Sequence, residues 1–515
     1  MMFTTLLVLG LLATSSYVFA ASKPNFVIML MDDMGWGDLG VFGEPSKETP
    51  NLDQMAAFGM LFPDFYSANP LCSPSRAALL SGRLPIRNGF YSDNAHARNA
   101  YTPQVIVGGI NDTEILFPEL LQKAGYRNKI IGKWHLGHRP QYHPLKHGFD
   151  EWFGAPNCHF GPYNDKNTPN IPVYRDAEMA GRYYEEFQID QKTGESNLTQ
   201  MYIEEALTFI EKNALSDTPF LLYWAVDATH DPLYASKKFL GTSNRGLYGD
   251  AVRELDYGVG QILQKLAELG IDSNTLAFFS SDNGAATYAK TGGGSNGPFL
   301  CGKETTFEGG MREPAIAMWP GKIRPGTVSR QLGNLMDLFT TLLELAGIPK
   351  PDDRIIDGIS LTGAFFNNSN TDRPIFFYRG NTLMAVRVGN YKAHLWTWTN
   401  SLTEFNSGVN FCPGQEIENV TTHDQVDNTA QPLLFHVARD PGEKYLIRPS
   451  SEEYKQVMPG IQQIVNSHME YLVPGQPSLN YCDPAVQNWA PPGCLKLNKC
   501  LPAPPSKMTK CVWEH

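Results

Sequence analysis

The chain has 515 residues, which is too long for one compact hydrophobic core and indicates at least two domains. A hydrophobic content of 42% with 18% charged residues is ordinary for a soluble globular protein and excludes a wholly disordered chain. The net charge of −11 argues against nucleic acid as a partner.

The first 20 residues have the features of a secretory signal peptide. Residues 6–12 form an apolar core, and Val18, Phe19 and Ala20 resemble a small-residue cleavage site. A membrane anchor is the alternative, but this run is shorter than the roughly 18 residues needed to cross a bilayer. No later stretch is long and apolar enough to cross a membrane, so we expect no membrane span. Entry into the secretory pathway would make disulfides possible.

Apolar runs then alternate with helical patterns as far as about residue 346. The runs that predict buried parallel strands are 25–31, 129–131, 219–226 and 274–281. The segments with helical periodicity are 113–124, 198–213, 249–269 and 334–346. This alternation predicts a doubly wound α/β domain.

Polar residues follow each of the four predicted strands. They are Asp32 and Asp33, Lys133 and His135, Asp227 and His230, and Asp282 and Asn283. One such pair could simply end a strand or cap a helix, but four at one edge predict a site, because open α/β sheets bind ligands there. Asp32, Asp33, Asp282 and Asn283 offer only hard oxygen ligands, which suit calcium or magnesium better than zinc.

The segment 72–82 predicts a helix with a cysteine at its start. We expect Ser73 to cap it, Pro74 to occupy its first turn and Gly82 to end it. Cys72 would then lie at the positive end of the helix, one turn from Arg76, where an anion and an activated nucleophile are favoured. The alternative is a structural disulfide cysteine before an ordinary helix.

Beyond about residue 370 the pattern changes to short strands separated by Gly and Asn. Residues 374–379, 383–388 and 391–398 predict an antiparallel sheet, and 451–472 predict a helix. From residue 474 the chain is rich in Pro, Gly and Cys, which indicates an irregular tail held by disulfides. Four sequons mark candidate glycosylation sites at Asn111, Asn197, Asn367 and Asn419.

Two motifs resemble the signatures of the sulfatase family. The first is Cys72-x-Pro-Ser-Arg followed by Leu-x-Ser-Gly82, and the second is residues 125–135, with Asn128 where Ser or Thr is usual. The similarity covers nearly the whole chain. It implies an alkaline-phosphatase-like fold with a signal peptide at 1–20, a catalytic domain at 21–372, a C-terminal antiparallel-sheet domain at 373–473 and a disulfide-held tail at 474–515.

The resemblance also implies the chemistry. Cys72 would be oxidised to formylglycine by a dedicated formylglycine-generating enzyme, and a calcium ion would be held by Asp32, Asp33, Asp282 and Asn283 with residue 72 nearby. The hydrated aldehyde would attack sulfur with help from His135, and His230 with Lys303 would protonate the departing sugar oxygen. Arg76, Lys133 and Lys303 would neutralise charge on the sulfate, although Lys303 by itself could be a solvated surface lysine. Tyr101 matches a substrate-contacting position, with a packed surface tyrosine as the alternative.

The implied disulfides are Cys301–Cys412, Cys482–Cys511 and Cys494–Cys500, with Cys158 unpaired. The segments around the site resemble most closely those of sulfatases that release 6-sulfate from N-acetylgalactosamine and galactose at the non-reducing ends of chondroitin 6-sulfate and keratan sulfate. Such an enzyme would be a lysosomal homodimer. A sequence pI of about 5.6 with 12 histidines fits this expectation, because acid would reduce repulsion of a polyanionic substrate.

Three other functions remain open on the sequence. The first is a 4-sulfatase or another arylsulfatase of the same family. The second is a phosphate mono- or diester hydrolase of the wider superfamily, although its zinc branch needs ligands that are scarce here. The third is a secreted binder of sulfated glycans with an inactive site, which the full set of acid, base and cationic residues disfavours.

Overall fold

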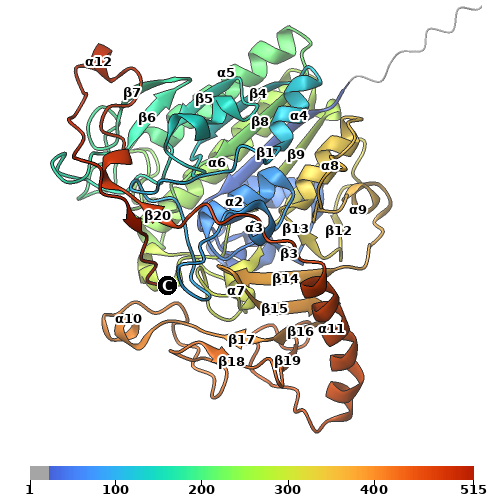
Figure 1. Cartoon of the computed structure of the whole chain (residues 1–515). Helices are drawn as coiled ribbons and strands as arrows, with labels where there is room; N and C mark the ends of the chain where they lie inside the picture. The colour runs from blue at the N-terminus through green and yellow to red at the C-terminus, as the bar shows by residue number, and fades with distance from the viewer. Residues whose placement is uncertain (1–22) are drawn as a thin grey trace, which may run out of the picture.

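The computed structural model describes residues 23–515, so the predicted signal peptide at 1–20 lies outside the described residues. A ten-stranded mixed sheet runs through the larger part of the molecule (Figure 1). From edge to edge its strands are β12 (Thr327–Val328), β2 (Met60–Leu61), β11 (Ile316–Met318), β9 (Thr275–Ser281), β1 (Asn25–Met31), β8 (Phe220–Ala225), β4 (Arg127–Gly132), β5 (Glu151–Gly154), β6 (Pro172–Arg175) and β7 (Glu178–Arg182).

The five central strands are parallel. β1 lies between β9 and β8, with Ile28 opposite Phe278 on one side and Tyr223 on the other, and β4 and β5 continue the parallel pairing. All seven residues of β1 are buried, which explains why the sequence shows an unbroken apolar run there instead of an alternating one. The four predicted strands are confirmed, and the run at 25–31 has the bounds that the sequence predicted.

Helices cover both faces of this sheet. Phe26, Ile28 and Leu30 of β1 pack in a core with α2 (Cys72–Ser81), α4 (Phe117–Lys123) and α8 (Asp337–Leu345). Val27, Met29 and Met31 face the opposite core, which contains α1 (Pro50–Phe58), α5 (Leu198–Leu215) and α6 (Gly246–Glu268). Because successive side chains of a strand point to opposite faces, β1 contributes to both cores. The predicted doubly wound α/β domain is therefore confirmed.

A smaller antiparallel sheet forms the C-terminal part, below the main sheet in Figure 1. Its strands are β14 (Pro374–Arg379), β15 (Thr382–Val388), β16 (Tyr391–His394) and β19 (Leu433–His436), and α11 (Glu452–Glu470) packs on it. The predicted strand at 391–398 is wrong in extent. β16 ends at His394, and β17 (Trp396–Thr397) pairs with β18 (Val426–Asp427) in a separate two-stranded sheet.

Short elements complete the described chain. They are α3 (Pro85–Asn88), α7 (Glu308–Met311), α9 (Thr362–Asn367), α10 (Leu402–Asn406), α12 (Cys494–Leu497), β20 (Tyr481–Cys482), β21 (Thr509–Lys510), and the three-stranded sheet of β10 (Arg312–Glu313), β3 (Phe65–Tyr66) and β13 (Gly333–Asn334). Within residues 23–515, no helix has both the length and the apolar character needed to cross a membrane.

The tail returns from α11 to the larger domain. In Figure 1 it leaves α11, passes in front of α2 and α3, and reaches β20 and α12 on the far side. Gly475 N–H donates to the carbonyl of Ile86, and Ser478 N–H donates to that of Gly89. Disulfides join Cys482 to Cys511 and Cys494 to Cys500. Backbone hydrogen bonds and disulfides thus hold a segment with little secondary structure of its own.

A buried ionic cluster connects β16 of the smaller sheet to α7 and the loop before it. Lys392 Nζ of β16 lies 3.1 Å from Glu308 Oε1 of α7 and 3.3 Å from Glu443 Oε1, and it donates to the carbonyl of Thr306. Burial opposes ionisation of Glu308, but Lys392 and two arginines outweigh it and lower the pKa of this carboxyl to about 2. Removing one charge would leave others buried without compensation.

We therefore expect Lys392→Met to cost about 3–5 kcal/mol in the free energy of unfolding. Urea unfolding followed by tryptophan fluorescence would measure the loss. Lys455→Met is the matched control, because Lys455 pairs with Glu452 at the surface, where its side chain is 57% exposed, and removing such a pair costs about 1 kcal/mol or less. Equal losses in the two variants would contradict the interpretation that the buried cluster stabilises the contact between β16 and α7.

Candidate active site

The carboxyl ends of the central strands bring the expected polar residues to one edge of the sheet. Asp32 and Asp33 follow β1, and Asp282 and Asn283 follow β9, whose register places Ser281 opposite Met31. Lys133 follows β4, and His230 lies five residues beyond the end of β8. Parallel neighbours end at the same edge, so residues separated by up to 250 positions meet there.

Helix α2 delivers Cys72 and Arg76 to the same edge. The helix begins at Cys72, and all of its residues are buried. The expected capping role of Ser73 is wrong, because Leu71 is the N-cap and the Ser73 hydroxyl instead lies 3.2 Å from that of Thr102. Gly82 ends the helix as expected, with a left-handed φ of 69° that a side chain would strain.

Three buried ion pairs form the centre of the site. Arg76 Nη2 lies 2.7 Å from Asp282 Oδ2, Lys133 Nζ lies 2.6 Å from Asp32 Oδ2, and Lys303 Nζ lies 2.8 Å from Asp33 Oδ2. The six side chains are at most 4% exposed. Each carboxylate therefore has one cation at hydrogen-bond distance, and the formal charges of the six groups cancel.

The pKa values in this cluster follow from burial and crowding. Burial disfavours the charged form of Asp32, but the Lys133 and Arg76 charges outweigh it and hold its pKa well below the usual range. Burial and the Asp32 charge raise the pKa of Asp282 to about 6 despite the Arg76 pair. Burial would lower the pKa of Lys133, but the Asp32 charge outweighs it, and Lys133 remains protonated.

Cys72 is unpaired and buried within this cluster. Its Sγ lies 3.3 Å from Asp32 Oδ1 and 3.8 Å from Asp33 Oδ1. The alternative of a structural disulfide at Cys72 is therefore wrong. Burial and the nearby Asp282 and Asp32 charges raise the pKa of the thiol well above its usual value. The unmodified side chain is held as a neutral thiol, which is a weak nucleophile.

The oxygen donors of the site suit a hard cation, whereas the sulfur of Cys72 and the ring nitrogen of His230 beside them do not. One ligand atom each from Asp32, Asp33, Cys72 and His230 lie within 4.8 Å of one another. Asn283 Nδ2 donates to Asp33 Oδ1 over 2.7 Å, and Asn283 Oδ1 is buried without a hydrogen-bond partner. A buried amide oxygen beside carboxylates is a ligand that calcium or magnesium prefers.

Two histidines lie at the rim of the cluster. Both ring nitrogens of His135 are buried without partners, and burial together with Lys133 lowers its pKa well below the usual value. Burial and Lys303 lower the pKa of His230, whose Nε2 lies 3.8 Å from Asp33 Oδ2. Asp33 and His135 have φ values of 60° and 63°, so the backbone is strained at two residues of the site.

Some residues near the site were not predicted from the sequence. His159 Nδ1 lies 2.7 Å from Asp227 Oδ2, and its ring centroid lies 6.3 Å from that of His230. Cys158 Sγ lies 3.6 Å from His230 Nε2. His159 was not given a role of its own, because its strand-end partner Asp227 is 68 positions away in the sequence. Tyr101 lies further out, with its ring centroid 6.3 Å from that of His135.

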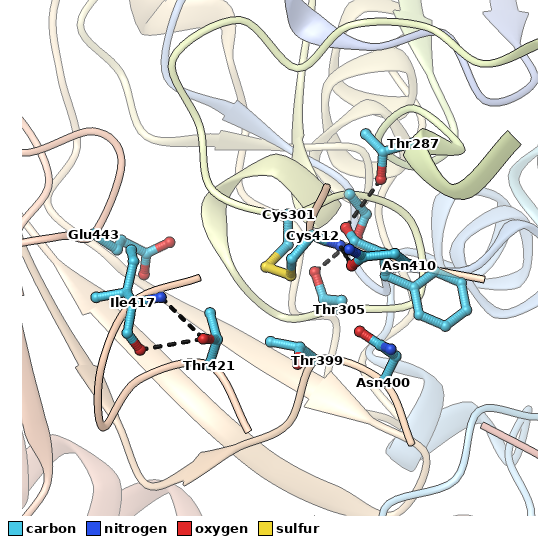
Figure 2. Close-up of a disulfide and its surroundings, with 12 residues drawn as sticks. Thr287, Cys301, Thr305, Thr399, Asn400, Asn410, Cys412, Ile417, Thr421 and Glu443 are labelled. Carbon is cyan, nitrogen blue, oxygen red and sulfur yellow. Dashed lines mark hydrogen bonds between the residues drawn. A yellow bond between two sulfur atoms is a disulfide. The ribbon is translucent and has the colours of Figure 1, made fainter. Parts of the chain in front are cut away.

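The loop that carries Lys303 is bonded to the C-terminal part. Cys301 and Cys412 form a disulfide, and Thr287 Oγ1 donates to the carbonyl of Phe411 over 2.9 Å (Figure 2). Within the C-terminal part, Cys412 N–H donates to Asn410 Oδ1, so the disulfide joins a loop that is itself hydrogen-bonded. The three disulfides in residues 23–515 are the pairs that the family resemblance implied, and Cys158 is free.

Comparisons with known proteins agree with this site. A family model described as sulfatase matches residues 24–348, and one described as the C-terminal region of aryl-sulfatase matches residues 370–502. The chain therefore belongs to the sulfatase family of hydrolases, as its two motifs indicated.

Similarity to particular relatives extends over almost the whole chain. It is 67% identical over 508 residues to the N-acetylgalactosamine-6-sulfatase of Rattus norvegicus, covering 98% of this chain and 96% of the relative. The Homo sapiens protein of that name is 66% identical over 497 residues, with 96% and 95% covered. Arylsulfatase A of Homo sapiens is 35% identical, with 96% and 98% covered.

Solved structures share the fold. A sulfatase from Pseudoalteromonas sp. superposes with a TM-score of 0.73 at 27% identity, covering 88% of this chain and 92% of that one. A phosphonate monoester hydrolase of Agrobacterium radiobacter has a TM-score of 0.55 at 17% identity, with 87% and 96% covered. The second likeness concerns the fold alone.

We expect the Cys301–Cys412 disulfide to stabilise the protein more than Cys494–Cys500. Its cysteines are 111 residues apart, against 6 for the second pair, and loop-closure entropy predicts contributions of about 5 and about 2 kcal/mol. Paired Cys→Ser replacements, compared by thermal unfolding without reductant, would measure the difference. A larger loss from removing the short-range pair would contradict this expectation.

Proposed function

We propose that the protein is an exo-acting sulfatase that removes 6-sulfate from N-acetylgalactosamine and galactose at the non-reducing ends of chondroitin 6-sulfate and keratan sulfate. The observation that carries the proposal is the 66–67% identity to N-acetylgalactosamine-6-sulfatases over nearly the full length. The clustering of Cys72, the carboxylates and the cations at one sheet edge supports sulfate-ester chemistry at this site.

Residue 72 would supply the nucleophile after modification. A neutral buried thiol is poorly suited to attack, whereas the hydrate of a formylglycine at this position supplies a nucleophilic oxygen and a second hydroxyl that allows sulfate to leave. The modifying enzyme would have to act before folding, because Cys72 is 1% exposed. The start of α2 adds backbone N–H groups that favour an anion.

The cationic side chains would bind the sulfate. Arg76, Lys133 and Lys303 balance three carboxylates. A bound calcium ion would therefore give the cluster an excess of two positive charges, complementary to an anionic ester. Asp32, Asp33, Asp282 and Asn283 would hold it, and their oxygen donors fit. When bound, the ion would polarise the S–O bonds, and Lys133 and Lys303 would orient the ester.

Two histidines would move protons. His135 would accept one from the nucleophile, because neither of its buried ring nitrogens has another hydrogen-bond partner. His230 would give one to the departing sugar oxygen. Its low pKa makes the protonated ring a strong acid, and acidic surroundings increase the protonated fraction. Lys303 beside it stays charged because the Asp33 pair outweighs its burial, and it would stabilise the leaving oxygen.

The biological setting is part of the proposal. Lysosomal location, a homodimeric state and maturation by the formylglycine-generating enzyme are proposed with it, because the family resemblance implies them. Domain boundaries at 21–372, 373–473 and 474–515 fit the two sheets and the tail. All four sequon asparagines are at least partly exposed; Asn197, Asn367 and Asn419 are exposed and Asn111 is half-buried, so each is accessible to glycosylation.

We expect the purified protein to release sulfate faster from 6-sulfated than from 4-sulfated N-acetylgalactosamine oligosaccharides at about pH 5. Ion chromatography of released sulfate would measure both rates. Faster release from the 4-sulfated compound would contradict the proposed 6-sulfate specificity and show that the protein is a sulfatase of different specificity. Release from neither would favour the inactive glycan binder, and preferential release of phosphate from matched phosphate esters would favour the phosphoesterase.

Cys72→Ala is the control for this experiment. The variant should fold and be secreted but lose measurable turnover, because it lacks the nucleophile. Mass spectrometry of the peptide that carries residue 72 should show loss of the thiol sulfur in the active wild-type protein. An intact cysteine in fully active protein would contradict the proposed modification.

We expect calcium to raise the thermal unfolding temperature of the wild-type protein relative to a chelator. At about 100 times the dissociation constant, the stabilisation would be about 2.7 kcal/mol. Asn283→Ala leaves the three ion pairs in place and should reduce the calcium-dependent shift. Asp250→Asn is the control, because Asp250 is a buried carboxylate that accepts backbone hydrogen bonds from 241–243. A full shift in Asn283→Ala would exclude Asn283 as a ligand.

A further inference from the structure

A cavity of about 330 Å³ lies beside the candidate active site, and the C-terminal end of the chain forms one of its walls. Leu71, the residue before Cys72, and Glu304, the residue after Lys303, both line it. Tyr101 lines it as well. Two residues of the cavity wall are thus adjacent in sequence to Cys72, the proposed nucleophile, and to Lys303, which is proposed to stabilise the leaving oxygen. The remaining wall includes Trp513, Glu514 and His515.

The last residues are fixed in place by several bonds. The Cys482–Cys511 disulfide anchors the segment at one end. At the other end, Asn99 N–H donates to the carbonyl of His515 over 2.9 Å. The His515 ring bridges two carboxylates, with Nδ1 2.7 Å from Glu404 Oε1 and Nε2 3.7 Å from Glu304 Oε1. Figure 1 shows the chain end between the main sheet and α10.

Three rings connect this wall to the site. The Trp513 ring centroid lies 5.6 Å from that of Tyr101 at an interplanar angle of 58°, and Tyr101 lies 6.3 Å from His135. Trp513 is 8% exposed, and its Nε1 is buried without a hydrogen-bond partner. A buried indole N–H usually has a hydrogen-bond partner, so an unpaired one at the wall of a cavity calls for an explanation.

We propose that Trp513, together with Tyr101, is a substrate-binding residue that positions the sugar ring carrying the sulfate. One face of a galactose-type ring presents several C–H bonds and is apolar, so it packs favourably on an aromatic ring, while its hydroxyls remain free for polar groups such as Glu304. The inference rests on the proposed function, since it assumes a sulfated sugar as ligand. It assigns sugar recognition to the tail and sulfate recognition to Arg76, Lys133 and Lys303.

Binding to the inactive Cys72→Ala protein tests this assignment without requiring turnover. Calorimetric titration would compare N-acetylgalactosamine 6-sulfate with inorganic sulfate. Adding Trp513→Ala should weaken sugar binding roughly tenfold and change sulfate binding less than about twofold. Trp513→Phe keeps an aromatic ring and should recover most of the sugar affinity. Met508→Ala is the control, because Met508 lies on the same tail, is 61% exposed and does not line the cavity.

Unchanged sugar affinity in Trp513→Ala would overturn the inference, as would equal losses for both ligands or the absence of sugar binding by the parent at millimolar concentration. Thermal unfolding of each variant would identify a general loss of structure, and Trp513→Phe decides the case if Trp513→Ala unfolds. The proposed function fails separately, if wild-type protein that binds the sugar through Trp513 releases no sulfate from it.

Discussion

The burial of three carboxylates at one edge of a parallel sheet is the constraint on which the rest of the structure depends. Asp32, Asp33 and Asp282 lie where two adjacent strands end, and each would be costly to bury alone. Three cations compensate them, and each comes from a different element. Arg76 requires a helix buried along its whole length, Lys133 requires β4, and Lys303 requires a loop held close to the sheet. The position of those elements is therefore fixed by electrostatics as well as by packing.

The C-terminal part contributes to the same constraint from outside. The loop that carries Lys303 has no regular secondary structure between β9 and α7 apart from a short 3-10 turn, so it needs other support. The disulfide to Cys412 and the ionic cluster around Lys392 provide this support from the C-terminal part. The tail then forms a wall of the cavity beside the site through residues 513–515. A catalytic loop, a second domain and the chain end are thus coupled through contacts within one region.

Much of this arrangement could be predicted from the sequence because its physical signals are local. A strand buried on both faces must be continuously apolar, so β1 was predicted with its observed bounds, and the polar residues after each strand could only meet at one edge. Ser73 was misjudged because its hydroxyl has a better partner in Thr102, which lies 29 positions away. The run 391–398 was predicted as one strand because sequence does not show where a strand changes its pairing partner. The approach of Trp513 to Tyr101 depends on a disulfide and on docking over a long sequence distance, for which no periodicity exists.

The topology of the main sheet also determines how late in synthesis the site can be completed. Cys72 is synthesised early. β1 must lie between β8 and β9 before the site is enclosed, and both of these strands are synthesised much later. About 210 residues separate Cys72 from Asp282, and at roughly 5–20 residues per second the ribosome needs about 10–40 s to add them. During that interval Asp282, which pairs with Arg76 one turn after Cys72 in α2, has not yet been added. Chain order alone therefore delays completion of the site around this cysteine by tens of seconds, and only then can folding enclose it.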